Sequence, residues 1–244
     1  MAKKTLFIAF VVSLGGFLFG FDAGIISGVM SYAGPQFDLN DAQTGWVVSS
    51  PSFAAMIAML FAGRLSDHLG RKKILIAVAF LYALSAITSA YAFSYETLYI
   101  ARMVGGLAFG AALILAPTYI AEISTAVNRG KLVSIQQLNI VLGFFTAFLS
   151  NYFFNQFNVS GSETLDDENV WRWMLGVEFF PAILYFGLLF FVPKSPRWLY
   201  TQNQSDSAKN ILEKIHGKTQ AEVEIQSIET NIKESENAKT VSFS

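Results

Sequence analysis

Six runs of apolar residues divide this 244-residue chain, and each is long enough to cross a lipid bilayer as a helix. A hydrocarbon core about 30 Å thick requires roughly 20 apolar residues in a helix. Charged residues make up 14% of the chain, against roughly 25% in an ordinary soluble domain. The runs are 5–30, 44–63, 74–93, 97–119, 132–154 and 172–192. We therefore predict an all-α membrane protein in which residues 1–192 form a bundle of six transmembrane helices.

Outside these runs, lysine and arginine fall almost entirely on one side of the six-span arrangement. The residues on the basic side include Lys3, Lys4, Arg64, Arg71, Lys72, Lys73, Arg129, Lys131, Lys194 and Arg197. Arg172 is the exception, and the loop before it, residues 155–170, is acidic. Because loops rich in lysine and arginine stay in the cytoplasm, we expect a multi-pass protein of the plasma (inner) membrane with both termini in the cytoplasm.

The last part of the chain, residues 193–244, is polar. Between residues 205 and 237, charged residues alternate with Ile, Leu and Val at helical spacing. This pattern predicts a cytoplasmic linker with short amphipathic helices and a frayed tail. The sequence has no cysteine, and therefore no disulfide or thiolate metal ligand. His68 and His216 are isolated, so we expect no metal site, no cofactor, no nucleic-acid partner and no enzymatic activity.

Asp22 is an acid near the middle of the first apolar run. A carboxylate there costs about 2.5–3.5 kcal/mol on insertion scales, so it is expected to have a partner or a function. Arg102, in the fourth run, is the candidate partner. The pair either couples proton binding to a conformational change, because a carboxylate separated from its cation tends to bind a proton, or forms a static salt bridge. Glu178, in the sixth run, either tunes this pair or faces the cytoplasmic charges.

Four short motifs follow one another along the chain. Residues 16–22 read Gly-Phe-Leu-Phe-Gly-Phe-Asp, and residues 63–71 have the spacing Gly-Arg-x-x-Asp-x-x-Gly-Arg. Residues 117–132 contain Pro-Thr-Tyr-Ile-Ala-Glu-Ile and then Arg-Gly-Lys-Leu, and residues 193–199 read Pro-Lys-Ser-Pro-Arg-Trp-Leu. In order and spacing, these motifs resemble those of the sugar porter family in the major facilitator superfamily.

The resemblance implies a transporter that moves a monosaccharide by alternating access, with proton-coupled symport. Such proteins have twelve spans in two halves of six, and each half is an inverted 3+3 repeat. This chain would be the N-terminal half, and the C-terminal six-helix half, absent here, or a partner chain would be needed. Two alternatives stay open: a truncated or sensor-like membrane protein without transport activity of its own, and a facilitative carrier without proton coupling.

The resemblance also assigns roles to residues. Asp22 and Arg102 match a proton-coupling pair, with Glu178 as a second intramembrane acid. The residues of the expected sugar site are Phe19, Gln137, Ile140, Val141 and Phe144, of which the last four share one helical face. Amide and aromatic groups suit a ligand rich in hydroxyl groups. The residues of the expected cytoplasmic charge network are Arg64, Asp67, Arg71, Glu122, Arg129 and Arg197.

Glycine residues lead to two expectations about how the helices meet. Gly63 and Gly70 permit a tight reversal between the second and third helices, and Asp67 is placed to cap the third. Gly105, Gly106 and Gly110, in the fourth run, permit close approach of a neighbouring helix.

Overall fold

The computed structural model describes residues 3–159, 166 and 168–241. Within these residues the chain forms ten helices and no strands. The middle of the acidic loop predicted between the fifth and sixth runs, residues 160–165 and 167, lies outside the described residues.

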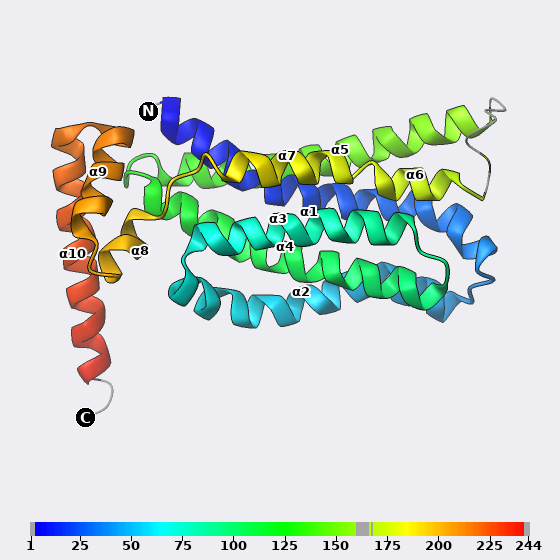
Figure 1. The fold of residues 1–244 in the computed structure, drawn as a ribbon, viewed down its shortest axis with the longest axis horizontal. Coiled ribbons are helices and arrows are strands. Elements are labelled where there is room, and N and C mark those ends of the chain that lie inside the picture. The colour runs from blue at the N-terminus through cyan, green and yellow to red at the C-terminus, as the bar shows by residue number, and fades with distance from the viewer. Residues whose placement is uncertain (1–2, 160–165, 167, 242–244) are drawn as a thin grey trace.

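The six predicted spans are confirmed as helices long and apolar enough to cross a membrane (Figure 1). They are α1 Lys3–Gln36, α2 Asp41–Leu69, α3 Arg71–Ala90, α4 Tyr95–Ile123, α5 Arg129–Val159, and the pair α6 Val170–Gly176 and α7 Phe179–Leu189. The last span differs from the prediction of one continuous helix. It is interrupted at Val177 and Glu178, so that the intramembrane acid sits at a break in the helix.

Two of the spans begin at side-chain caps that the sequence encodes locally. At the start of α2, the Asn40 side chain accepts a hydrogen bond from the Gln43 backbone (2.9 Å), and the Gln43 side chain accepts one from the Asn40 backbone (3.0 Å). Ser94 and Thr97 make the same reciprocal arrangement at the start of α4. These capping boxes satisfy backbone N–H groups that the first turn of a helix leaves without partners.

Three further helices lie across one end of the bundle (Figure 1). They are α8 Pro196–Thr201, α9 Ser205–His216 and α10 Lys218–Val241. The chain's N-terminal end and the α2–α3 and α4–α5 connections lie at this same end. His216 of α9 is hydrogen-bonded to the Ile123 carbonyl at the end of α4 (2.8 Å), which ties the amphipathic helices to the bundle.

Close helix approach depends on glycine in two interfaces. A Cβ atom at Gly106 of α4 would lie 2.2 Å from the Pro51 carbonyl oxygen of α2, so the close approach predicted for this glycine is confirmed. The α1–α5 interface uses the same device. A Cβ atom at Gly143 would lie 2.2 Å from the Phe17 carbonyl oxygen, and one at Gly20 would lie 2.1 Å from the Ile140 carbonyl oxygen. Small residues let backbones pack closely where the surrounding lipid is as apolar as the side chains.

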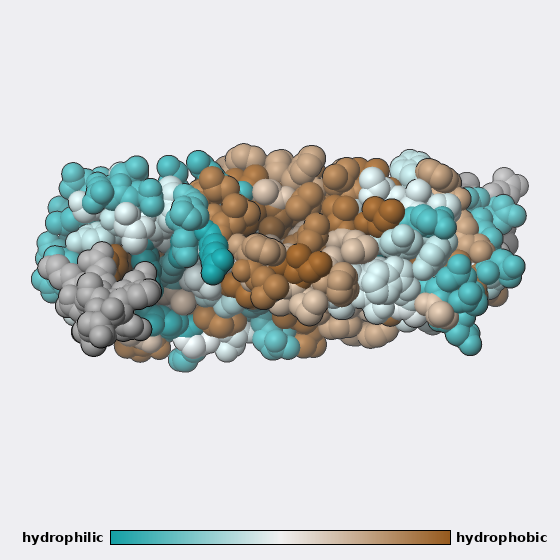
Figure 2. All heavy atoms as spheres, turned by 90° about the horizontal axis from the view of Figure 1, so that it is seen from below, coloured by the Kyte–Doolittle hydropathy of each residue, from teal (hydrophilic) through white to brown (hydrophobic). Residues whose placement is uncertain are grey.

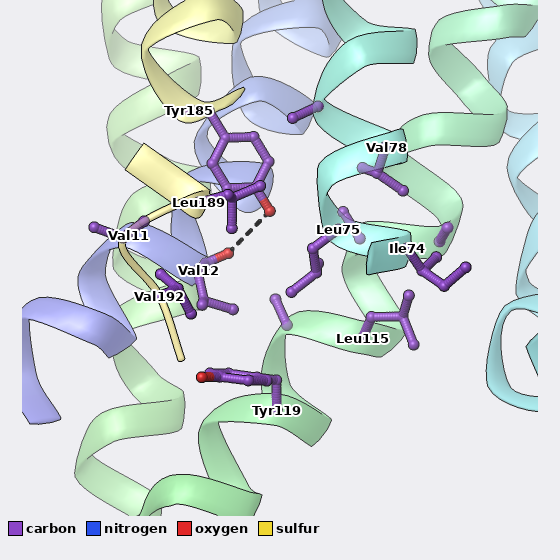
Figure 3. Packing of buried hydrophobic residues seen from close by; sticks show 14 of the residues in the cluster. Val11, Val12, Ile74, Leu75, Val78, Leu115, Tyr119, Tyr185, Leu189 and Val192 are labelled. Atoms are coloured by element: carbon purple, nitrogen blue, oxygen red, sulfur yellow. Dashed lines mark hydrogen bonds between the residues drawn. The ribbon is translucent and has the colours of Figure 1, made fainter. Parts of the chain in front are cut away.

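The bundle has a packed interior and an apolar exterior. Figure 3 shows side chains of α1, α3, α4 and α7 that meet inside the bundle, where the Tyr185 hydroxyl donates to the Val12 carbonyl (3.4 Å). Figure 2 shows an apolar band across the middle of the molecule, with polar residues towards both ends. Leu60 and Phe61 of α2 are more than half exposed. This distribution is that of a protein in contact with lipid or with further membrane helices.

The reversal between α2 and α3 is made by one of the two glycines singled out in the sequence. Gly70 has a φ of +90°, a conformation that side chains other than glycine disfavour. A Cβ atom there would also meet the Trp198 ring of α8 at 3.1 Å. Gly63, in contrast, lies inside α2 and takes no part in the turn.

Candidate functional site

A bidentate ion pair lies inside the bundle, as predicted from Asp22 and Arg102, the two opposite charges in separate apolar runs. Arg102 of α4 donates from Nη1 to Asp22 Oδ1 (3.1 Å) and from Nη2 to Asp22 Oδ2 (3.3 Å) of α1. Its Nε donates to the Val47 carbonyl of α2 (3.2 Å). Both charged residues are buried. One guanidinium therefore connects three helices, and each charge has the partner that a low-dielectric site requires.

Glu178 belongs to the same buried cluster. It is 4% exposed and interacts electrostatically with both Asp22 and Arg102. Of the two alternatives left open for this acid, these interactions favour a place near the ion pair. The cluster contains two carboxyl groups and one guanidinium. If it is to be electrically neutral, one of the carboxyl groups must carry a proton.

The residues expected to form a sugar site are only partly brought together. The Phe19 ring of α1 packs against Phe144 of α5, with ring centroids 6.4 Å apart, and against Phe109 of α4, at 4.8 Å. Gln137 and Val141 lie on the exposed side of α5.

Ile140 is half-buried and turned towards α1, where its side chain would lie 3.0 Å from a Cβ atom at Gly16. The predicted face of α5 is therefore divided between the helix interface and the open surface of the bundle.

Two buried polar side chains on α5 have different surroundings. Asn139 donates to the Ser13 hydroxyl of α1, a hydrogen bond between two helices. Gln136 is equally buried, but its side-chain oxygen accepts no hydrogen bond from any residue that the structure describes. A buried amide oxygen without a donor is uncommon in a folded protein. The sequence pattern gave no sign that these neighbouring amides would differ.

The charge network at the α8–α10 end is built around Glu122, at the end of α4. Arg71 donates from Nε to Glu122 Oε1 (3.1 Å) and pairs through Nη2 with Asp67 (2.8 Å). Ser195 donates to the other oxygen of Glu122 (2.6 Å). Asp67 does not cap α3 as predicted, because Gly70 occupies the cap position and Asp67 pairs with Arg71 instead.

Three other members of the expected network take different positions. Arg197 interacts electrostatically with Glu122, and both line a cavity of about 600 Å³. Arg64 and Arg129 form no ion pair with any residue in the described part of the chain. The static contacts thus join α2, α3, α4 and the start of α8, and they leave the start of α5 out.

Comparison with known proteins assigns this chain to a family. A family model described as "Sugar (and other) transporter" matches residues 8–244. This chain belongs to that family. An arabinose–proton symporter of Bacillus subtilis (strain 168) is 36% identical over 94% of the chain and 49% of its own length. A glucose transport protein of Synechocystis sp. is 40% identical over 88% of the chain and 46% of its own length.

A solved structure confirms the fold. The proton:xylose symporter of the major facilitator superfamily, bound to 6-bromo-6-deoxy-D-glucose, superposes with a TM-score of 0.88 at 31% identity. The match covers 96% of this chain and 54% of the symporter. The chain thus spans about half the length of the relatives it matches, and it has the fold of one six-helix half of a major facilitator protein.

Proposed function

We propose that this chain is the N-terminal half of a proton-coupled sugar transporter that works by alternating access. The observation that carries the proposal is the buried cluster of Asp22, Arg102 and Glu178. Two carboxyl groups beside a single guanidinium form a site that can gain and lose one proton inside the membrane. The relatives named as sugar–proton symporters support the same reading.

In the proposed mechanism, Asp22 is the proton carrier and Arg102 is its switchable partner. While the two are paired, each compensates the charge of the other. Movement of α1 relative to α4 would separate them, because the pair joins these two helices. The isolated carboxylate would then take up a proton. Glu178 interacts electrostatically with both residues. In this mechanism it would determine whether Asp22 or Glu178 itself carries the proton.

We propose that the sugar binds against the α1–α5 surface, where Phe19 and Phe144 supply aromatic faces. Gln137 and Val141 would complete this surface from the exposed side of α5. The pocket needs a second wall, which in a twelve-span protein comes from the other half. We accordingly propose that each set of three helices is one arm of an inverted repeat, that residues 193–244 form the cytoplasmic linker, and that a second six-helix half is the partner.

The function is tested by uptake measurements with and without that second half. In proteoliposomes, the chain alone should give no saturable uptake of radiolabelled arabinose, xylose or glucose, because only half of the pocket is lined. Co-reconstitution with the C-terminal half of a sugar–proton symporter should give saturable uptake of at least one of them. Saturable uptake by the chain alone would instead indicate a transporting homodimer, and absence of uptake from every completed pair would contradict the proposal.

We propose that the end with α8, α9 and α10 faces the cytoplasm, because it carries nearly all the lysine and arginine outside the membrane. The chain has no cysteine, so single cysteines report location directly. In intact cells, a membrane-impermeant maleimide should label Ser94→Cys, at the start of α4, and should label Ser207→Cys, on the exposed side of α9, only after the cells are opened. The reverse order of labelling would show that the orientation is wrong.

A further inference from the structure

A second hollow lies at the opposite end of the bundle from α8, α9 and α10, where α3 ends and α6 begins. It has a volume of about 560 Å³, within the range of small-molecule sites. The residues along its walls include Ile87, Tyr91, Phe154, Trp173, Phe179 and Phe180. None of the residues assigned to the proton cluster, the sugar surface or the charge network lines it.

The walls of this groove are apolar and open towards the surroundings. Phe180 is 68% exposed and Trp173 is 56% exposed. Gly176 provides part of the floor, and a Cβ atom there would have only one neighbour within 4 Å, the Ala90 side chain at 3.6 Å. A long, flexible apolar group could therefore lie along the groove without displacing protein atoms.

One cation lies at the mouth of the groove. Among the residues that the structure describes, Arg172 is the one lysine or arginine in or next to the connections at this end of the bundle. Its Nη1 donates to the Ala90 and Ala92 carbonyls (3.1 and 2.5 Å), and its guanidinium lies over the Trp171 ring, 4.2 Å from the centroid. Within the described part of the chain, Nε and Nη2 have no acceptor. The guanidinium is thus fixed in place with donors left for an anion.

The position of the groove along the membrane normal indicates which kind of ligand it suits. Tyr91 follows the last residue of α3 and Asn169 precedes the first of α6, so the mouth lies where the spans end. Tyrosine and tryptophan concentrate at this level, where lipid headgroups begin. A cation at headgroup level above an apolar groove complements a molecule with a phosphate at one end and hydrocarbon at the other.

We propose that this groove binds one glycerophospholipid of the adjacent leaflet, with its phosphodiester on Arg172 and an acyl chain along Ile87, Phe179 and Phe180. The site depends on the transmembrane placement of the chain and not on its transport activity. The bound lipid would lie along α6 and the start of α7, and Val177, in the break between these helices, lines the groove. It would therefore contact the same span that carries an acid of the proton cluster.

Native mass spectrometry of the purified 244-residue chain in non-ionic detergent tests the proposal. Dioleoylphosphatidylglycerol is titrated and the one-lipid complex is quantified. Arg172→Gln keeps a donor for the Ala90 and Ala92 carbonyls but removes the charge, and we expect about tenfold weaker lipid binding. Arg172→Lys keeps the charge and should lose less. Gly176→Leu fills the groove and should also weaken binding about tenfold, because the acyl chain loses its place.

A matched variant controls for unspecific effects of a leucine on the same span. Gly187→Leu lies on α7, where an added Cβ atom has no neighbour within 4 Å, and it should bind lipid as the unmodified chain does. Dioleoylglycerol, which has no phosphate, should bind weakly, and glycerol phosphate, which has no chains, should not bind. Equal lipid binding by Arg172→Gln, Gly176→Leu and the unmodified chain would overturn the proposal. Binding of glycerol phosphate as tight as that of the lipid would show an anion site and would overturn it as well.

Discussion

In a transporter completed with a second six-helix half, Asp22→Asn should abolish the accumulation of sugar against its gradient while sugar exchange continues. Asparagine is close in size to aspartate and can still hydrogen-bond to Arg102, but it cannot bind and release a proton. Exchange of internal for external sugar requires no net proton movement, so it should survive. The measurement compares accumulation and exchange in proteoliposomes with an imposed proton gradient, at pH 6 and pH 8.

Substitution of Arg102, the partner of Asp22, distinguishes a role of the pair in proton coupling from a purely structural role. Arg102→Ala leaves Asp22 without its bidentate partner and the Val47 carbonyl without its donor. Loss of one partner of a buried pair costs about 3–5 kcal/mol, so both accumulation and exchange should fall. The double variant Asp22→Asn with Arg102→Gln should recover stability, because no uncompensated charge remains. If Asp22→Asn still concentrates sugar under a proton gradient, the pair is a static salt bridge and the completed protein is a facilitative carrier.

Gly143→Ala should destabilise the bundle strongly. Among the glycines of the α1–α5 interface, we expect a larger effect only from alanine at Gly20. The new Cβ atom would lie 2.2 Å from the Phe17 carbonyl oxygen and 2.8 Å from the Phe21 nitrogen. Both are backbone atoms of a helix, so neither can move aside as a side chain would. We expect a loss of about 3 kcal/mol, the upper end for overpacked interiors, or complete failure to fold.

Thermal unfolding in detergent, followed by the tryptophan fluorescence of the chain, measures this effect. Gly187→Ala is the matched control, because an added Cβ atom there meets no atom within 4 Å. Alanine is also the better helix former by about 1 kcal/mol, so the control should unfold at the same temperature or slightly higher. An unfolding temperature of Gly143→Ala equal to that of Gly187→Ala would show that α1 and α5 can separate at little cost.

The six spans could be predicted from the sequence because their determinants are local. A run of roughly 20 apolar residues has few alternatives to a membrane helix, and capping residues such as Asn40 and Ser94 mark where helices start. The Asp22–Arg102 contact was also predictable. Two opposite charges in separate apolar runs are each costly alone, and few other partners were available to either.

Other features depended on how each helix is rotated and how deeply it sits beside its neighbours. Periodicity placed Gln137, Ile140, Val141 and Phe144 on one face, but the close glycine contact of α1 with α5 buries one edge of that face and exposes the other. The sequence alone established the spans and the charges that must pair. Only the tertiary structure decided that Glu178 lies within electrostatic range of the ion pair, because that placement depends on the packing of α6 and α7 against α1 and α3, which no local pattern encodes.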